Sequence, residues 1–133
     1  MRLVITIVSL LFTGSIFAQD SSKTKLKEYL GVLTLVEKYR DDKNWTNADQ
    51  AIVGQHFQRL VKYKTAGIVV LAGRTQYETS NPQMMGLVIF FAKDDAAAEI
   101  FMQEDPAVKN GIMLAKVHPY AIAVSLCETP KNK

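Results

Sequence analysis

Apolar residues fall into four short runs along the chain, and each run has the length and composition of a β-strand. The run Tyr29–Val36 (YLGVLTLV) is almost continuously apolar, which predicts a strand buried on both faces. The other three runs are Ile68–Ala72, Leu87–Phe91 and Ile112–Leu126. The last run is broken near His118-Pro119. Because Asn81-Pro82 is a turn signal, the second and third runs are expected to form a hairpin.

Two of the segments between these runs are predicted to be helical. From Asn47 to Lys64, apolar residues recur at helical spacing, and Gly67 shortly afterwards supplies a stop. Asp94 can cap a second helix, which is rich in alanine and continues through Met102. The charged segment 37–47 is expected to be a loop.

The resulting order, β-α-β-β-α-β, predicts an α+β protein with a ferredoxin-like fold, in which both helices lie on one side of an antiparallel sheet. Two helices cover one face of such a sheet. The three central strands nevertheless show little polar alternation, so the second face should be buried by something outside the subunit. A symmetric dimer that packs sheet against sheet satisfies this requirement, and we therefore expect a homodimer.

The first eighteen residues are predicted to be a secretory signal peptide. Arg2 gives a basic start, residues 3–12 are almost wholly apolar, and small residues precede Gln19. Cleavage after Ala18 would leave a single domain over residues 19–133, exported to the periplasm or secreted. The apolar run is shorter than the ~20 residues of a spanning helix, so no stable membrane anchor is expected after processing.

Charge, cysteine content and the lack of known motifs argue against several kinds of partner, cross-link and cofactor. The chain has 16 Lys and Arg against 13 Asp and Glu, and this near balance argues against a nucleic-acid partner. Cys127 is the only cysteine, so no intramolecular disulfide can form, and its thiol is expected to be a buried filler. No glycine-rich phosphate loop and no short-range metal-ligand spacing occur, so neither a cofactor nor a metal is predicted.

Five pieces of the chain, in their order and spacing, resemble the YCII-related (YciI-like) family. They are Gly54–Leu60, Ala66–Thr75, Ile89–Ala92, Asp105–Gly111 and Val117–Tyr120. The resemblance extends from about Tyr29 to Val124 and implies a dimeric α+β barrel. The chain departs from the commonest family pattern at Gly73-Arg74, where many members have Gly-Pro, and in its signal peptide.

The resemblance also implies an active-site dyad formed by His56 and Asp105. A carboxylate that accepts from one ring nitrogen fixes the tautomer of the imidazole, and the other nitrogen is then free to move a proton. Each residue also has a structural interpretation. His56 lies four residues from both Ile52 and Leu60, which is typical of a helix histidine at the core boundary. Asp105-Pro106 is also an ordinary N-cap and first-turn pair of a short helix, and one carboxylate could serve both roles.

Two further residues are candidates for substrate binding. Arg74, just beyond a predicted strand, could bind an anionic group through two parallel hydrogen bonds, although an exposed loop arginine is the common alternative. His118 precedes a proline in a strand-like segment, where it could instead be a partly exposed edge residue. A metal site made of His56, His118 and a carboxylate has no supporting ligand spacing.

Two functions therefore remain open at the level of sequence. In the first, suggested by family members that perform elimination on ring compounds, the protein is a lyase- or isomerase-type enzyme that uses His56 and Asp105 on a small organic molecule. In the second, it is a non-catalytic dimer that binds a small molecule or serves as a scaffold. A His56 ring within hydrogen-bond reach of Asp105 at the wall of an open cavity favours the enzyme, and a carboxylate that only caps backbone N–H groups favours the alternative.

Overall fold

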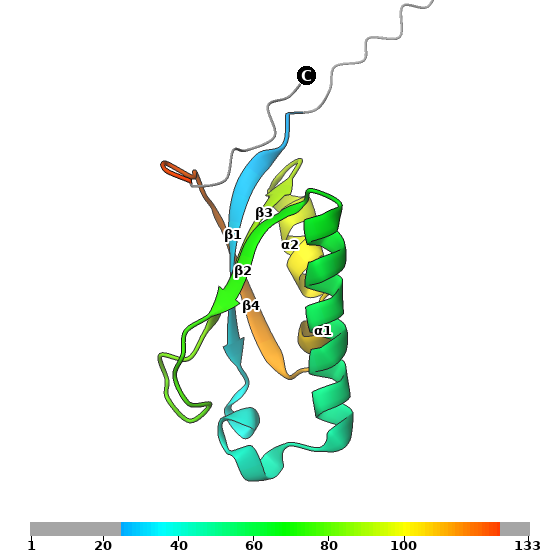
Figure 1. Ribbon diagram of the computed structural model, residues 1–133, viewed down its shortest axis with the longest axis vertical. Coiled ribbons are helices and arrows are strands. Elements are labelled where there is room, and N and C mark those ends of the chain that lie inside the picture. Colours follow the sequence, from blue (N-terminus) through cyan, green and yellow to red (C-terminus); the bar gives the residue numbers. More distant parts are fainter. Residues whose placement is uncertain (1–24, 126–133) are drawn as a thin grey trace, which may run out of the picture.

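A four-stranded antiparallel sheet carries both long helices on one face (Figure 1). The structure is a computed structural model that describes residues 25–125. In the order β2-β3-β1-β4, the sheet contains β1 (Lys27–Leu35), β2 (Val69–Arg74), β3 (Gly86–Ala92) and β4 (Met113–Pro119). The helices are α1 (Asn47–Thr65), α2 (Asp95–Gln103) and α3 (Pro106–Lys109). The predicted α+β class, the β2–β3 hairpin and the ferredoxin-like element order are confirmed.

Two segments differ from the expectation. The expected loop before α1 contains two 3-10 helices, η1 (Glu37–Arg40) and η2 (Asp42–Asn44). The final strand, which was expected to continue beyond its His-Pro break, ends at Pro119, because proline has no N–H to donate to the strand ladder. The predicted signal peptide and Cys127 lie outside the described residues.

Side-chain caps begin the two longer helices, at Asp94 as the sequence predicts and at Thr46, for which no cap was predicted. Thr46 caps α1 by accepting from the backbone N–H of Asp49, and the Asp49 carboxylate in turn accepts from the backbone N–H of Thr46. The hydrogen bond from the Thr46 hydroxyl, followed by that from its backbone N–H, lowers the pKa of Asp49. Asp94 caps α2 in the same way through the N–H of Ala97.

The main core lies between the sheet and α2. Tyr29 and Phe90 of adjacent strands are almost fully buried, and they pack with Met102 of α2. A side chain at Gly31 would begin only 2.6 Å from Cε of Met102, so glycine lets this methionine lie directly against β1. The Tyr29 hydroxyl donates to Oδ1 of Asp95 at 2.6 Å, which fixes the start of α2 to β1. This hydrogen bond and burial raise the pKa of Tyr29 to about 12.

Helix α1 packs more loosely against the sheet. None of its 19 residues is buried, although Leu60 and Tyr63 pack against the main core. The N-terminal half of α1 packs through Ile52 and Val53 against a second, smaller core cluster. This cluster contains Leu35, Tyr39, Met84, Ala107 and Ile112. In Figure 1, α1 runs along the same face of the sheet as α2, and it packs against β2. Space for a cavity therefore remains between α1 and the strands.

The second face of the sheet is largely apolar, although Lys116 and His118 of β4 also lie on it, and no helix of the described residues covers it. Leu30 and Val32 of the first strand remain partly exposed there in the single subunit, so burial of this strand on both faces stays a prediction that requires a partner. On the same face, Leu71 of β2 and Leu114 of β4 are more than half exposed. We call this surface the open sheet face, and its apolar side chains are those of Leu30, Val32, Leu71, Leu87, Ile89, Phe91 and Leu114.

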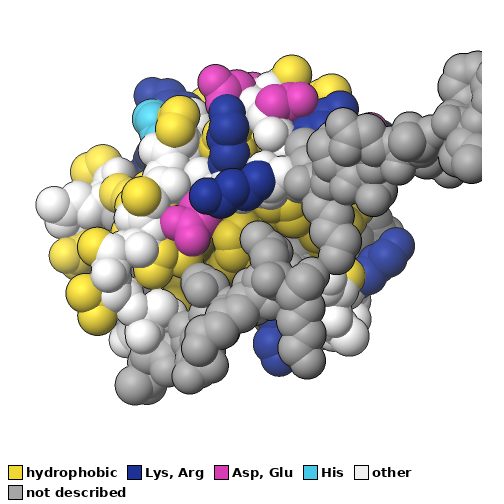
Figure 2. All heavy atoms as spheres, turned by 90° about the horizontal axis from the view of Figure 1, so that it is seen from above, with side chains coloured by type: hydrophobic (Ala, Val, Ile, Leu, Met, Phe, Trp, Pro, Cys, Tyr) yellow, Lys and Arg dark blue, Asp and Glu magenta, His cyan; other side chains and the backbone are white. Residues whose placement is uncertain are grey.

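Charged side chains of both signs are interspersed on the surface seen in Figure 2. Within residues 25–125, no helix has both the length and the apolar character that a membrane crossing requires.

Candidate active site

His56 and Asp105 meet between α1 and the start of α3. Nδ1 of His56 lies 2.8 Å from Oδ2 of Asp105, although the two residues are 49 positions apart in the sequence. Helix α1 presents His56 from its middle, and Asp105 is held as the N-cap of α3 with Pro106 at the first helical position. The side chain of His56 is only 13 % exposed and that of Asp105 only 2 %. The two predicted dyad residues are thus brought together in a largely buried place.

The two oxygens of Asp105 have different partners. Oδ1 accepts from the backbone N–H of Ala107 at 2.9 Å, which makes Asp105 a helix cap. Oδ2 faces His56 and is not used by the cap. The structural and the chemical interpretations of this carboxylate therefore hold together, because each uses a different oxygen atom.

The surroundings of the carboxylate decide which ring nitrogen of His56 carries hydrogen. An ionised carboxylate can only accept hydrogen bonds, and the described polar neighbours of Asp105 are an N–H donor, the imidazole and a guanidinium. Nδ1 must then donate to Oδ2, which leaves the lone pair of Nε2 free in the neutral ring. A histidine held in this tautomer can accept a proton from another molecule.

Arg59 is a third member of this group that was not predicted from the sequence. Its Nη1 lies 3.7 Å from Oδ2 of Asp105, and its Nη2 donates to the carbonyl oxygen of Phe101 at 2.6 Å. The guanidinium carbon lies 4.3 Å from the centre of the Phe101 ring, so a cation–π contact also holds it. Nη1 is buried and makes no hydrogen bond within the described residues.

Arg59 supplies a permanent positive charge beside a buried negative one. The negative charge of Asp105 is therefore compensated by Arg59 even while His56 is neutral. Without Arg59, a neutral imidazole would leave this buried charge uncompensated. The sequence did contain a signal, because residues three apart on a helix share a face and Arg59 follows His56 by three positions.

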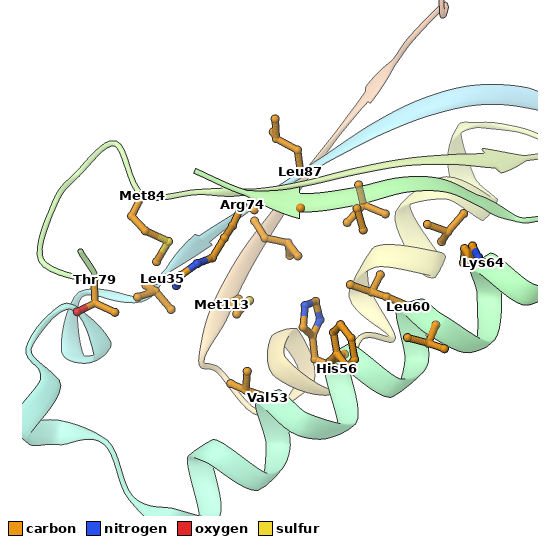
Figure 3. A pocket seen from close by; sticks show the side chains of 18 of the residues that line it. Leu35, Val53, His56, Leu60, Lys64, Arg74, Thr79, Met84, Leu87 and Met113 are labelled. Carbon is orange, nitrogen blue, oxygen red and sulfur yellow. The ribbon is translucent and has the colours of Figure 1, made fainter. Parts of the chain in front are cut away.

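A cavity of about 470 Å³ lies between α1 and the sheet, and His56 is part of its wall. This volume is within the usual range of ~300–1,000 Å³ for small-molecule sites. In Figure 3 the His56 ring points from α1 into the space beneath the strands. Most of the lining is apolar and includes Leu33, Leu35, Val53, Leu60, Met84 and Met113.

The two candidate binding residues lie on opposite faces of the sheet. Arg74 at the end of β2 lines the cavity together with His56. His118 does not line it, because it pairs with Leu30 on the open sheet face, away from α1. His118 is therefore also separated from His56 by the sheet. Among the described residues, no cluster of three or more His, Cys, Asp or Glu side chains is suited to bind a metal.

Comparison with known proteins assigns the family. No curated protein gives a significant match to this sequence. A family model for the YCII-related domain matches residues 32–119, which is more than half of the chain and includes every strand but the start of β1, the helices, and both members of the His56–Asp105 pair. The chain therefore belongs to the YCII-related domain family.

Proposed function

We propose that this protein is a small lyase- or isomerase-type enzyme in which His56 moves a proton of an organic molecule bound in the cavity. The observation that carries the proposal is the 2.8 Å contact between His56 and Asp105 at the wall of a largely apolar cavity. A cap alone would not require the second oxygen of Asp105 to face an imidazole. By the criterion derived from the sequence, this geometry favours the enzyme over a purely structural role.

The proposed proton transfer begins at Nε2 of His56, which takes a proton from a C–H bond of the bound molecule. The electron pair of that bond then follows one of two routes. In an elimination it forms a double bond to the adjacent carbon, from which the leaving group departs with its own electron pair. In an isomerisation the double bond shifts, and His56 returns the proton to a different carbon. Asp105 stabilises the imidazolium formed in either route.

Hydrogen–deuterium exchange tests the proposal before the substrate is known. Small molecules that stabilise the protein in a thermal-shift screen are selected, because a ligand at 100 times its Kd adds about 2.7 kcal/mol of stability. Each is then incubated with the protein in deuterated water, and its C–H signals are followed by proton NMR. We expect exchange or conversion of at least one of them, slowed about 10²–10⁴-fold by His56→Gln.

His118→Gln is the matched control, because it makes the same change in the only other histidine, on the opposite face of the sheet. Its exchange rate should equal that of the wild type. Molecules that bind but neither exchange nor react, or a His56→Gln rate equal to the wild-type rate, would contradict the enzyme and support a non-catalytic binding or scaffolding protein.

The functional unit that we propose is a homodimer joined through the open sheet face. Seven apolar side chains on this face are left partly or largely exposed by the single subunit, and leaving such a patch in water is unfavourable. Packing of two such faces about a two-fold axis would bury both at once. Most of the cavity lies on the other face of the sheet, where His56 and Arg74 line it, and Leu87 is the one residue named for the open sheet face that also borders it, so each subunit would keep its own site.

We also propose export with removal of residues 1–18, on the basis of the N-terminal sequence. Mass spectrometry of the protein isolated from its native host should give an N-terminus near Gln19 in the fraction outside the cytoplasm. Recovery of the chain with Met1 intact from the cytosol would contradict export.

A further inference from the structure

Two positively charged side chains of the cavity have no partner. Arg74 ends β2 and Lys64 lies in the last turn of α1, and both line the cavity. Within residues 25–125, neither side chain makes a hydrogen bond, an ion pair or a cation–π contact. No aspartate or glutamate is among the lining residues. The charge facing the cavity is therefore entirely positive.

The other basic side chains in this part of α1 are held by neighbours. Arg59 donates to the Phe101 carbonyl and lies beside Asp105, and Lys62 lies over the ring of Tyr63. Figure 3 shows the Arg74 side chain entering from β2 the same space that the His56 ring enters from α1, with Lys64 at the far end. A ligand against the apolar wall would thus meet His56 between two free cations.

We propose that the cavity binds a small organic carboxylate with an apolar body, an inference that rests on the proposed function and names the class of its substrate. The planar guanidinium of Arg74 matches a carboxylate through two parallel hydrogen bonds. The apolar body packs against side chains such as Leu35, Met84 and Met113. A reacting carbon near the acid group then faces His56.

A carboxylate fits this site better than a phosphate ester does. Phosphate sites in proteins are built from clustered backbone N–H groups at helix N-termini and glycine-rich loops. The starts of α1 and α3 do not offer such groups, because the side chains of Thr46 and Asp105 already occupy them. One guanidinium, with a lysine at the other end of the cavity, matches a single negative charge.

Arg74 also borders a polar hollow on the outer side, together with Asp42 and Glu78. Of these carboxylates, Asp42 already accepts from the Thr79 hydroxyl. Neither forms an ion pair with Arg74 within the described residues. The guanidinium is therefore available to a ligand on the cavity side.

Matched pairs of acids and amides test this inference. The probes are 3-phenylpropionate, cyclohexanecarboxylate and hexanoate, each compared with its primary amide at low salt by calorimetry and by NMR of the His56 ring. At least one acid should bind about tenfold more tightly than its amide and shift the His56 signals. Arg74→Gln should bring this ratio close to one, whereas Lys64→Gln should lower it only about two- to threefold, because Lys64 lies at the far end of the cavity and an exposed ammonium interacts weakly through water.

Lys62→Gln is the control, because it removes one positive charge from the same helix outside the cavity lining. It should leave the acid-to-amide ratio unchanged. Equal binding of acids and amides, no saturable binding by any of the three acids, or tighter binding of 2-phenylethyl phosphate than of 3-phenylpropionate would overturn the proposal. These results would not by themselves contradict the proposed enzyme, because proton exchange that depends on His56 in neutral molecules would still support it. Conversely, acid binding that depends on Arg74, without any exchange that depends on His56, would support the carboxylate site and contradict the enzyme.

Discussion

Replacement of Asp105 by alanine is expected to lower the free energy of unfolding by about 3–5 kcal/mol. The substitution leaves the guanidinium of Arg59 largely buried without its counter-ion, since the Arg59 side chain is 13 % exposed. It also removes the cap from the backbone N–H of Ala107 and the partner of Nδ1 of His56. Urea unfolding of the two proteins at pH 7 measures the difference.

A second capping aspartate of the same fold provides the control. Asp94 caps α2 through the N–H of Ala97, but its carboxylate is half exposed and faces no buried cation. Asp94→Ala should therefore lower the free energy of unfolding only by the contribution of one N-cap, about 1 kcal/mol. If Asp105→Ala costs no more than Asp94→Ala, the buried group of Asp105, His56 and Arg59 has no energetic role beyond capping.

Removal of the orphaned charge should recover part of the loss. In the Asp105→Ala background, Arg59→Met keeps an apolar side chain over the Phe101 ring and removes the uncompensated charge. We expect the double variant to be more stable than Asp105→Ala alone, because groups in direct contact are not additive. A double variant less stable than both single variants would contradict the charge-balance explanation.

The second large effect concerns assembly. Ile89→Lys should convert the proposed dimer to a monomer at micromolar concentration, since Ile89 lies on β3 between Leu71 and Leu30 in the middle of the open sheet face. Burying an unpaired ammonium costs several kcal/mol, and a symmetric interface contains the substitution twice. We expect Kd for the dimer to rise at least roughly a hundredfold, equivalent to about 3 kcal/mol. Sedimentation equilibrium measures it.

Ile100→Lys is the matched control for this experiment. Ile100 is 61 % exposed on α2, on the helix side of the sheet, so the same substitution there should leave the dimer intact. A wild-type protein that sediments as a monomer would contradict the dimer outright. A dimer that Ile100→Lys disrupts and Ile89→Lys does not would assign the interface to the helices instead.

The parts of the fold that could be predicted from sequence are those with local signals. The helical spacing, the cap at Asp94 and the stop at Gly67 gave α1 and α2 close to their observed bounds. The apolar runs similarly gave β1, β2 and β3, whereas β4 is shorter than its run and ends at Pro119. The 3-10 helices η1 and η2 could not be predicted, because tertiary contacts such as that of the Tyr39 hydroxyl with Asp49 and of the Trp45 indole with the Tyr39 carbonyl hold this short polar segment.

The candidate site could be predicted only in part. His56 and Asp105 were paired through the family resemblance, because no rule of spacing relates two residues 49 positions apart. Arg59 was missed because its contacts, with Phe101 and Asp105, come from other elements. His118 was placed among the binding residues because the one-residue alternation of β4, which turns it to the open sheet face, depends on a strand register that sequence alone did not establish.

The state of the His56 ring tests the central claim most directly. Nitrogen-15 NMR of the imidazole at pH 8, above the ordinary range of histidine titration, reports which nitrogen carries hydrogen. We expect hydrogen on Nδ1 and a free lone pair on Nε2 in the wild type. Asp105→Asn, whose amide can donate as well as accept, should redistribute the His56 tautomers. Hydrogen on Nε2 in the wild type, or a tautomer ratio unchanged by Asp105→Asn, would contradict a proton-accepting His56 held by Asp105.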